Sequence, residues 1–341
     1  MKAVALTHYL PIDNPRSLFD TELPEPPAPT GHDLLVQVKA IAVNPVDTKV
    51  RAPKDKVENA PKVLGWDAAG VVQAVGPDVT AFAPGDEVFY AGDITRPGTN
   101  AELQLVDARI VGRKPRNLSF AQAAAFPLVT ITAWEAFFHH LALQPDGSGG
   151  QSGSILIIGG AGGVGSIGIQ LAKRAGLTVL ATASREETQS WVRELGADHV
   201  IHHHEPIEPQ LKAAGHEQVD YIANFHDTDR YWQLMADVIR PLGKIVSIVE
   251  NSAPVEIGLL KAKSVSFHWE FMFTRAMFRT PDMGEQGKLL DAAADLIEKG
   301  QLKRLDRQTY QPINAENLRA AHALLESGRS IGKITLEGWP A

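Results

Sequence analysis

Cysteine is absent from the 341-residue sequence. Its absence excludes disulfide bonds, cysteine nucleophiles and every zinc site that uses thiolate ligands. The sequence also lacks an apolar run that approaches the length of a membrane span, and its start, MKAVALTHYLPIDNP, is interrupted too early for a signal peptide. A net charge of −7 and the lack of a Lys/Arg stripe disfavour nucleic-acid binding. We therefore expect a cytoplasmic protein that binds neither nucleic acid nor membrane.

The composition that remains is typical of a globular protein. Hydrophobic residues make up 44% and charged residues 21% of the chain, and low-complexity tracts are absent. A chain of this length exceeds one ordinary hydrophobic core, so it predicts about two domains.

The most informative stretch is Ser154–Gly176, SILIIGGAGGVGSIGIQLAKRAG. Its apolar start, its glycines and the helical spacing of its later apolar residues predict a strand, a tight turn and a helix. Gly160, Gly162 and Gly165 fit G-x-G-x-x-G, in which the glycines permit the turn, the approach of a pyrophosphate and the packing of helix on strand. A glycine-rich turn without a ligand is the alternative. The place of the motif between strand and helix favours a dinucleotide site, with phosphates at the helix N-terminus.

The end of the following strand indicates which dinucleotide is bound. Ser184 and Arg185 follow the strand predicted at 177–183, at the position where an NAD site carries an acidic residue. A hydroxyl and a guanidinium suit a ribose 2′-phosphate. Glu186 and Glu187 fit the first turn of the next helix, where negative charge is favourable. We expect NADP(H), with an ordinary surface arginine as the alternative for Arg185.

The pattern along the chain separates a β-rich part from an α/β part. Strands are predicted at 2–6, 35–43, 69–75, 86–90 and 101–106, which indicates a small barrel-like domain. Ser119 and Gln122 form a capping box. A second helix is predicted after Pro127, and its largely apolar surface predicts that it is buried between layers. Further strands are predicted at 155–158, 177–183, 199–201, 219–223, 244–249 and 264–267, with helices at 164–175, 186–195, 206–214 and 229–240. This alternation predicts a doubly wound parallel sheet.

The remaining C-terminal part of the chain is predicted to be rich in helix. Helices are expected at about 284–300 and 315–328, and a final strand at 333–336. A helix-rich tail that ends in a strand indicates that the chain returns to the first domain.

Eight segments carry a resemblance to a known family. They are NPVDTK (44–49), GWDAAGVV (65–72), PLVTITAWEA (127–136), GGAGGVG (159–165), TASREET (182–188), LGADHVI (195–201), FHWEFMFTR (267–275) and GRSIGKI (328–334). Their order resembles the medium-chain dehydrogenase/reductase superfamily, in particular its zinc-free quinone oxidoreductase branch and the proteins labelled zinc-type alcohol dehydrogenase-like.

The resemblance implies an α/β architecture with three segments. An N-terminal GroES-like β-barrel catalytic domain is expected at 1–126, a doubly wound parallel-sheet Rossmann domain that binds NADP at 127–273, and a return to the catalytic domain at 274–341. The resemblance also implies a homodimer that pairs Rossmann sheets edge to edge, with Ser264–Phe267 as the candidate edge.

The departures from the zinc enzymes of this superfamily concern the metal. By the resemblance, zinc members place a cysteine ligand where this chain has Asn44, and a histidine–glutamate pair where it has Trp66 and Asp67. We therefore expect no metal. Without a Lewis acid the oxidation of a simple alcohol loses its means of activation, whereas reduction of an electron-poor quinone or enone does not need one.

The resemblance further implies roles for single residues near the nicotinamide. Asn44 is expected beside the nicotinamide ribose and the acceptor, as a hydrogen-bond donor to the developing oxyanion, with a turn residue before Pro45 as the alternative. Thr130 is expected near the nicotinamide, or else bonded to a helix carbonyl. Trp66 and Trp269 either line a flat acceptor pocket or belong to the core.

The other expected cofactor contacts lie further from the reacting atoms. His203 is expected near the adenosine end of the cofactor. His202, His203 and His204 could also suggest a metal site, but consecutive side chains at a strand end point in different directions, so a solvated loop is the better explanation. Arg329 and Lys333 are expected near the cofactor phosphates, or as a surface pair. Asp47 and Asp67 are expected to cap or to form salt bridges, with a proton relay as the alternative. The expected cofactor contacts are completed by Ala161, Gly163, Val164, Asn224 and Val249.

The leading hypothesis is an NADPH-dependent, metal-free oxidoreductase that reduces quinones or activated enones by hydride transfer. The alternatives are an enone reductase without quinone activity and an NADPH-binding redox sensor with little turnover. The sequence does not separate them, because all three need the same cofactor site.

Overall fold

The computed structural model describes residues 1–148 and 153–340. The chain divides into two compact units. Unit 1 consists of Met1–Ile131 and Phe273–Ala341, and unit 2 of Thr132–Met272. The domain boundaries predicted from the sequence lie at 126/127 and 273/274.

Unit 1 is built from two sheets. Its three-stranded sheet has the order β2-β1-β4, and its larger sheet has the order β15-β16-β3-β5-β6-β8, with β7 paired to β3 as well. The strands are β1 (Lys2–Tyr9), β2 (Phe19–Glu22), β3 (Asp33–Val43), β4 (Lys54–Val63), β5 (Ala68–Val75), β6 (Glu87–Tyr90), β7 (Leu103–Asp107), β8 (Val111–Arg113), β15 (Asp306–Tyr310) and β16 (Lys333–Glu337). This confirms the predicted barrel-like β domain.

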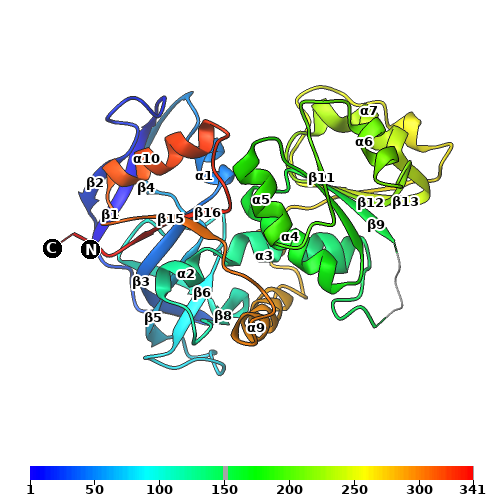
Figure 1. The fold of residues 1–341 in the computed structure, drawn as a ribbon. Helices are drawn as coiled ribbons and strands as arrows, with labels where there is room; N and C mark the ends of the chain where they lie inside the picture. Colours follow the sequence, from blue (N-terminus) through cyan, green and yellow to red (C-terminus); the bar gives the residue numbers. More distant parts are fainter. Residues whose placement is uncertain (149–152, 341) are drawn as a thin grey trace. The chain divides into compact units, whose positions relative to one another are not determined.

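Strand β3 is the centre of the larger sheet. Its apolar residues Leu34, Val36 and Val38 are fully buried and alternate with half-buried residues, as the sequence pattern predicts. The C-terminal strand β16 lies beside β3 (Figure 1). The two strands pair antiparallel, with Ile334 opposite Val43. This register brings the start of β16 beside the end of β3, where Asn44 follows.

Among the described residues, five helices of 5 to 14 residues belong to unit 1. They are α1 (Pro45–Arg51), α2 (Phe120–Ala124), α8 (Thr274–Phe278), α9 (Glu285–Glu298) and α10 (Ala315–Glu326). The predicted capping box is confirmed at α2, because the Ser119 hydroxyl accepts the Gln122 amide at 3.2 Å and the Gln122 side chain accepts the Ser119 amide at 3.0 Å. The helix expected after Pro127 begins as α3 (Pro127–Trp134) and continues as a π-helical segment, Glu135–His140.

Unit 2 is a single parallel sheet with the strand order β11-β10-β9-β12-β13-β14 (Figure 1, green to yellow). This is the doubly wound order, in which the order of strand addition reverses at the neighbouring parallel strands β9 and β12. The elements are β9 (Ser154–Ile158), α4 (Gly163–Arg174), β10 (Thr178–Thr182), α5 (Glu186–Glu194), β11 (His199–Ile201), α6 (Ile207–Ala213), β12 (Val219–Asn224), α7 (Thr228–Val238), β13 (Ile239–Ser247) and β14 (Ser266–Trp269). The predicted fold class is confirmed.

The core of unit 2 lies between the sheet and its helices. Leu156, Leu180 and Ile222 of the sheet belong to one buried cluster with Leu211 of α6 and Met235 of α7. On α4 and α5, the Trp191 indole donates to the Ser166 hydroxyl at 2.8 Å, which fixes the two helices to one another.

Two kinds of difference separate the predicted from the observed elements. Helix α7 ends at Val238, earlier than predicted, because a residue that precedes proline, here Arg240 before Pro241, is disfavoured in α-helix. Strand β4 is not predicted, because most of its residues are exposed and show no apolar alternation, and only backbone pairing with β1 makes it a strand.

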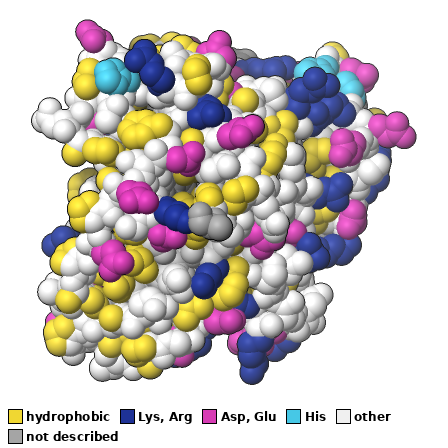
Figure 2. Space-filling model, turned by 90° about the vertical axis from the view of Figure 1, so that its left-hand side faces the viewer, with side chains coloured by type: hydrophobic (Ala, Val, Ile, Leu, Met, Phe, Trp, Pro, Cys, Tyr) yellow, Lys and Arg dark blue, Asp and Glu magenta, His cyan; other side chains and the backbone are white. Residues whose placement is uncertain are grey.

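Within the described residues, none of the helices combines the length and the apolar character that crossing a bilayer requires. On the face of the molecule shown in Figure 2, acidic and basic side chains are intermixed.

Candidate functional site

The glycine-rich turn of unit 2 connects β9 to α4, as the sequence predicts. Strand β9 ends at Ile158, Gly159 has a φ of +84°, and Gly162 is the N-cap of the 12-residue helix α4. The Gly159 amide donates to Thr182 Oγ1 at 2.9 Å, which links the carboxyl ends of β9 and β10. The first amides of α4 have no partner within the helix, and they lie at the carboxyl ends of the strands. An anion is favoured at such a helix start.

The three glycines of the motif differ in what surrounds them. An added Cβ would lie 2.2 Å from the Gly159 carbonyl oxygen at Gly165, and 2.9 Å from Ala181 Cβ at Gly160, so the protein's own packing requires both glycines. At Gly162 the nearest atom would be 3.5 Å away, and this residue is exposed. The open backbone at Gly162 therefore fits the approach of a dinucleotide pyrophosphate.

Ser184 and Arg185 lie after the carboxyl end of β10, and both are half-buried. Arg185 is the N-cap of α5, where its amide donates to Thr188 Oγ1 at 3.1 Å and its carbonyl accepts from the same hydroxyl at 2.7 Å. Glu186 and Glu187 occupy the first turn of α5 and are exposed, as predicted. The backbone at Arg185 is thus fixed by the helix start.

His203 lies after β11 and is half-buried. Burial, the neighbouring His204 and His226, and Arg230 lower the pKa of His203 to about 4, so its ring is neutral at pH 7. The rings of His202, His203 and His204 lie 4.5–6.4 Å apart. Across residues 1–148 and 153–340, no group of three or more His, Asp or Glu side chains is arranged to hold a metal ion.

Asn224 and Val249 take part in a buried network at the ends of β12 and β13. The Asn224 amide nitrogen donates to Thr228 Oγ1 and Ser247 Oγ, both at 3.2 Å, and its oxygen accepts the His226 amide at 3.2 Å. The Val249 carbonyl accepts the Thr228 hydroxyl. These bonds engage both ends of the Asn224 side chain, so this residue joins two strands to α7, a role that the sequence does not predict.

Trp269 is the last residue of β14 and lies opposite Ser247 at the carboxyl end of β13. Its side chain is 47% exposed and packs edge-on against Phe267, with ring centroids 5.0 Å apart. Trp269 is therefore a surface residue of unit 2 at the sheet edge where ligands of parallel sheets bind. It is not a core residue.

Unit 1 contains a buried polar cluster, defined here as Asn44, Asp47, Asp67 and Lys333. All four side chains are at most 3% exposed. The Lys333 ammonium donates to Asp67 Oδ2 at 2.8 Å, to the Val43 carbonyl at 3.1 Å and to Asn44 Oδ1. The Asn44 amide donates to Asp67 Oδ2 at 2.8 Å. The cluster thus joins the end of β3, the residue before β5 and the start of β16.

The two carboxylates of the buried polar cluster have different partners. Asp47 accepts the Asn44 backbone amide at 2.6 Å and so caps α1, and Asp67 forms the salt bridge with Lys333, which confirms the capping and salt-bridging roles predicted for them. The other Asp67 oxygen accepts the Leu128 amide at 2.8 Å. Burial raises the pKa of Asp67, and the Lys333 ammonium and the Asn44 amide oppose that rise. Removing one partner of a buried ion pair costs about 3–5 kcal/mol.

Burial also raises the pKa of Asp47, to about 7, and this rise is opposed by the Asn44 amide and by Lys333. Within the part of the chain that the structure describes, Asp47 Oδ1, Trp66 Nε1 and Thr130 Oγ1 are buried and have no hydrogen-bond partner. Thr130 therefore does not bond to a helix carbonyl. Buried polar atoms without partners are rare in folded proteins, so each of these atoms has hydrogen-bonding capacity that a ligand or water could satisfy.

Trp66 and Asp67 are held by a neighbouring loop, Asp93–Asn100. The Thr99 and Asn100 amides donate to the Gly65 and Leu64 carbonyls at 3.0 and 2.9 Å. Gly65 has a φ of +107°, and an added Cβ would lie 2.4 Å from the side chains of Thr99 and Asn100. The loop is therefore packed directly against the residues that precede Trp66.

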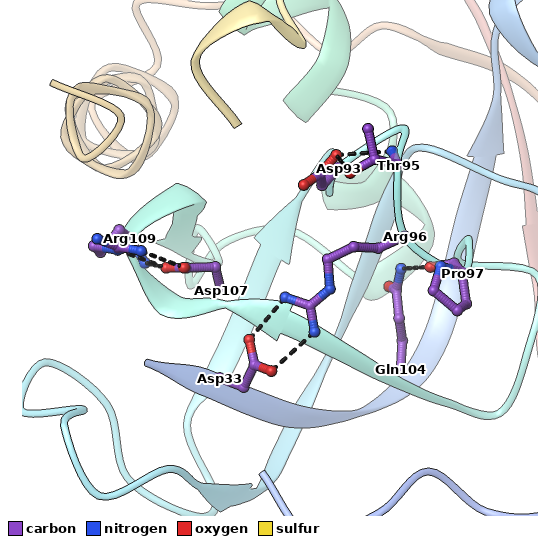
Figure 3. A network of polar contacts seen from close by, with 8 residues as sticks. All are labelled: Asp33, Asp93, Thr95, Arg96, Pro97, Gln104, Asp107 and Arg109. Carbon is purple, nitrogen blue, oxygen red and sulfur yellow. Dashed lines mark hydrogen bonds and ion pairs between the residues drawn. The ribbon is translucent and has the colours of Figure 1, made fainter. Parts of the chain in front are cut away.

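Figure 3 shows how this loop is fixed to the sheet. The Arg96 guanidinium makes two hydrogen bonds to the Asp33 carboxylate, at 2.8 and 2.9 Å, and the Gln104 side chain donates to the Pro97 carbonyl at 2.8 Å. Asp33 begins β3, the strand that ends beside Asn44. The loop and Asn44 are thus attached to the two ends of the same strand, β3.

Comparison with known proteins identifies the family. Residues 30–123 match the model of the alcohol dehydrogenase GroES-like domain, and residues 195–336 match that of the zinc-binding dehydrogenases. A zinc-type alcohol dehydrogenase-like protein of Staphylococcus aureus is 46% identical over 94% of this chain and 95% of its own length. The chain belongs to the medium-chain dehydrogenase/reductase superfamily, in its quinone oxidoreductase-like branch.

Other members of this superfamily are similar over the whole chain. A solved protein from Rhizobium etli CFN 42, assigned to the zinc-dependent alcohol dehydrogenases, has 53% identity and a TM-score of 0.94, covering 100% of this chain and 99% of its own. The Escherichia coli quinone oxidoreductase complexed with NADPH has 26% identity and a TM-score of 0.82, covering 99% and 100%. The 2-methylene-furan-3-one reductase of Solanum lycopersicum is 31% identical over 100% of this chain and 80% of its own length. The protein is therefore an oxidoreductase of the superfamily that uses nicotinamide cofactors.

The name of the superfamily's zinc members raises the question of whether the buried polar cluster fits zinc. Asn44 Oδ1 accepts from Lys333, both Asp67 oxygens accept hydrogen bonds, and the Trp66 indole nitrogen is a donor without a lone pair. A positive ammonium already lies against the carboxylate. These residues do not fit a zinc ion, because tetrahedral zinc needs anionic or neutral donors with free lone pairs.

The structure brings some of the predicted site residues together and separates others. Lys333 meets Asn44 in the buried polar cluster, and its three acceptors engage all three ammonium hydrogens, so its partners differ from the expected cofactor phosphates. Arg329 is exposed and is not part of the cluster. The pairing of Lys333 with Asp67 has no local signal in the sequence, since 266 residues separate them.

Proposed function

We propose that the protein is an NADPH-dependent, zinc-independent oxidoreductase that reduces quinones or activated enones. The observation that carries the proposal is the arrangement of Lys333, Asp67 and Asn44, in which an ammonium neutralises the buried carboxylate and a side-chain amide is held beside both. Such a site offers a hydrogen-bond donor but no Lewis acid, which suits acceptors that are already electron-poor.

Unit 2 would hold the cofactor. The open backbone at Gly162 and the first amides of α4 suit the pyrophosphate. Ser184 and Arg185 suit the ribose 2′-phosphate, since a guanidinium forms charge-assisted hydrogen bonds with phosphate oxygens. Glu186 and Glu187 lie in the first turn of α5, and they do not occupy the position of the acidic residue in an NAD site.

NADPH held at the glycine turn before α4 and at Arg185 would supply a hydride and become NADP⁺. The hydride adds to a carbon of the acceptor, and the electron pair that it displaces comes to rest on the acceptor oxygen, which then takes a proton from water. The role of this chain is to stabilise the negative charge on that oxygen. The Asn44 amide supplies the donor, and delocalisation in an enolate or a phenolate reduces the demand on it.

Two relatives support the choice of acceptors. The Escherichia coli protein is a quinone oxidoreductase, and the tomato protein reduces a 2-methylene-furan-3-one, an activated enone. A quinone and an enone have the same reacting unit, a carbonyl conjugated to a carbon–carbon double bond. One donor beside a carbonyl oxygen serves both.

The proposal is tested by following the oxidation of NADPH and of NADH by the purified protein, with an ortho-quinone and with an α,β-unsaturated ketone as acceptors. We expect turnover that depends on the acceptor and prefers NADPH. The Asn44→Ala variant is expected to lower turnover more than NADPH affinity. Binding of NADPH without oxidation by either acceptor would refute the proposed reaction and favour a sensor role.

A further inference from the structure

The two ends of the Asn44 amide face opposite charges. Its oxygen accepts from the Lys333 ammonium, and its nitrogen donates to the Asp67 carboxylate at 2.8 Å. An ammonium has no acceptor and a carboxylate has no donor, so the amide can bind both groups in one orientation only. The chemistry of the two neighbours therefore determines which end of the amide is the donor.

One hydrogen of the Asn44 amide is not used by the hydrogen bonds of the buried polar cluster. A side-chain amide nitrogen carries two hydrogens, and Asn44 uses one of them on Asp67. Over the described ranges, 1–148 and 153–340, Asn44 Nδ2 makes no second hydrogen bond. If the amide turned over, its oxygen would take the place of this hydrogen, and an electron-rich acceptor atom would meet a lone pair.

Lys333 is held firmly enough to impose this orientation. It is the first residue of β16, and its backbone amide donates to the Leu305 carbonyl at 2.8 Å. The adjacent pairing of Ile334 with Val43 fixes its distance from Asn44. The side chain is 3% exposed and gives its three hydrogens to Val43, Asn44 and Asp67. A water molecule is a poor substitute, because it donates to two acceptors only.

We propose that Lys333 is a positioning residue for the reduction reaction: through Asp67 and Asn44, its ammonium keeps one Asn44 amide hydrogen directed at the oxygen of the acceptor. The inference rests on the proposed function, and it gives Lys333 a task other than contact with the cofactor phosphates. The ligand that this hydrogen recognises is a carbonyl or phenolate oxygen, which has lone pairs and no hydrogen to donate.

The test compares Lys333→Met, Lys333→Arg and the double variant Asp67→Asn with Lys333→Met. The double variant removes both charges together, so it is expected to fold where the single Lys333→Met change leaves an unpaired buried carboxylate. Lys299→Met is the matched control, because Lys299 is an exposed lysine of the same unit. Turnover with an ortho-quinone and the dissociation constant of NADPH, from the quenching of its fluorescence, are measured for each protein.

We expect turnover at saturating NADPH to fall about a hundredfold in Lys333→Met and in the double variant, because a small misplacement of a positioning group costs about that factor. NADPH affinity should change less than turnover, and Lys333→Arg should recover part of the loss. A matching loss of NADPH affinity with unchanged turnover would overturn the inference in favour of a phosphate contact. Full turnover in the double variant would overturn it in favour of charge compensation alone.

A spectroscopic measurement separates this inference from the proposed function. The side-chain amide signals of Asn44 are identified in a ¹⁵N-labelled sample as those that Asn44→Ala lacks. In the unaltered protein the two hydrogens are expected to differ strongly in chemical shift, because one faces a carboxylate, and this difference should shrink in the double variant. An unchanged spectrum would overturn the inference even in a protein that turns over, because Lys333 would not orient the amide. Absence of turnover in the unaltered protein, with the spectrum changed in the double variant, would refute the proposed reaction and leave only the orientation of the amide.

Discussion

Arg185 is the residue on which the choice between NADPH and NADH depends. We predict that Arg185→Ala lowers the preference for NADPH about tenfold to a hundredfold, because a hydrogen bond to a charged group contributes about 1.5–3 kcal/mol. The measurement is kcat/KM for both cofactors. Arg193→Ala is the matched control, since Arg193 is an exposed arginine on the same helix. An unchanged preference for NADPH in Arg185→Ala would show that Arg185 does not bind the ribose 2′-phosphate.

Asp47 of the buried polar cluster makes the stability of the protein depend on pH. Burial raises its pKa from 3.8 to about 7 in the folded protein, so the folded state binds more protons than the unfolded state between these values. Stability from this group is therefore present at low pH and is lost as the pH rises through the folded pKa. Lys333 and Asp67 are the charged groups that act on it.

We predict that Asp47→Asn, which keeps an oxygen for the Asn44 amide, gains Tm relative to the unaltered protein as the pH rises from about 5 to about 8. Thermal unfolding at constant ionic strength gives the difference in Tm between Asp47→Asn and the unaltered protein at each of the two pH values. Asp55→Asn, at an exposed position of β4, is the control. Equal differences at both pH values would contradict the assignment.

The candidate site could be predicted from the sequence only where the chemistry is local. The strand–turn–helix at Gly160–Gly165 and the helix start at Arg185 are read from neighbouring residues, and both are found. The partners of Lys333 and the clamp of Asp33 on Arg96 depend on the pairing of β16 with β3 and on the path of a loop, which no local pattern encodes.

At the scale of elements, short continuous apolar runs predict the inner strands of unit 2, because both faces of a parallel sheet are covered. Each of its six strands falls at or near the predicted range. In unit 1, β4 and β15 are polar and largely exposed, and their strand character comes from the partners β1 and β16. An apolar pattern in the sequence cannot predict β4 and β15, because these strands have few buried apolar residues.

The glycine turn offers a prediction at this scale that separates folding from binding. Gly165→Ala places a Cβ 2.2 Å from the Gly159 carbonyl, so we expect it to lower the free energy of unfolding by about 1–3 kcal/mol, the usual cost of overpacking. Gly162→Ala meets no atom closer than 3.5 Å, so it should keep its Tm and weaken NADPH binding. Thermal unfolding and NADPH titration measure both. Equal losses of Tm in the two variants would show that Gly162 is needed for folding and not for the cofactor.

At the scale of the whole molecule, the two units divide the proposed chemistry. Unit 2 offers the elements that suit a dinucleotide, and unit 1 offers the buried polar cluster. Strand β14 is one of the two edge strands of the parallel sheet, and the homodimer that would pair two such edges stays a prediction. Elution at the size of a monomer would remove it.

We propose that the Lys333–Asp67 ion pair and the Asn44 amide serve the reaction without zinc. The most direct test measures the zinc content of the purified protein and its quinone reduction with NADPH before and after dialysis against a chelator. We predict zinc far below one equivalent per chain and a rate that neither chelation nor added zinc changes. One equivalent of zinc, with a rate that chelation abolishes and added zinc restores, would contradict the proposal that the reaction needs no zinc.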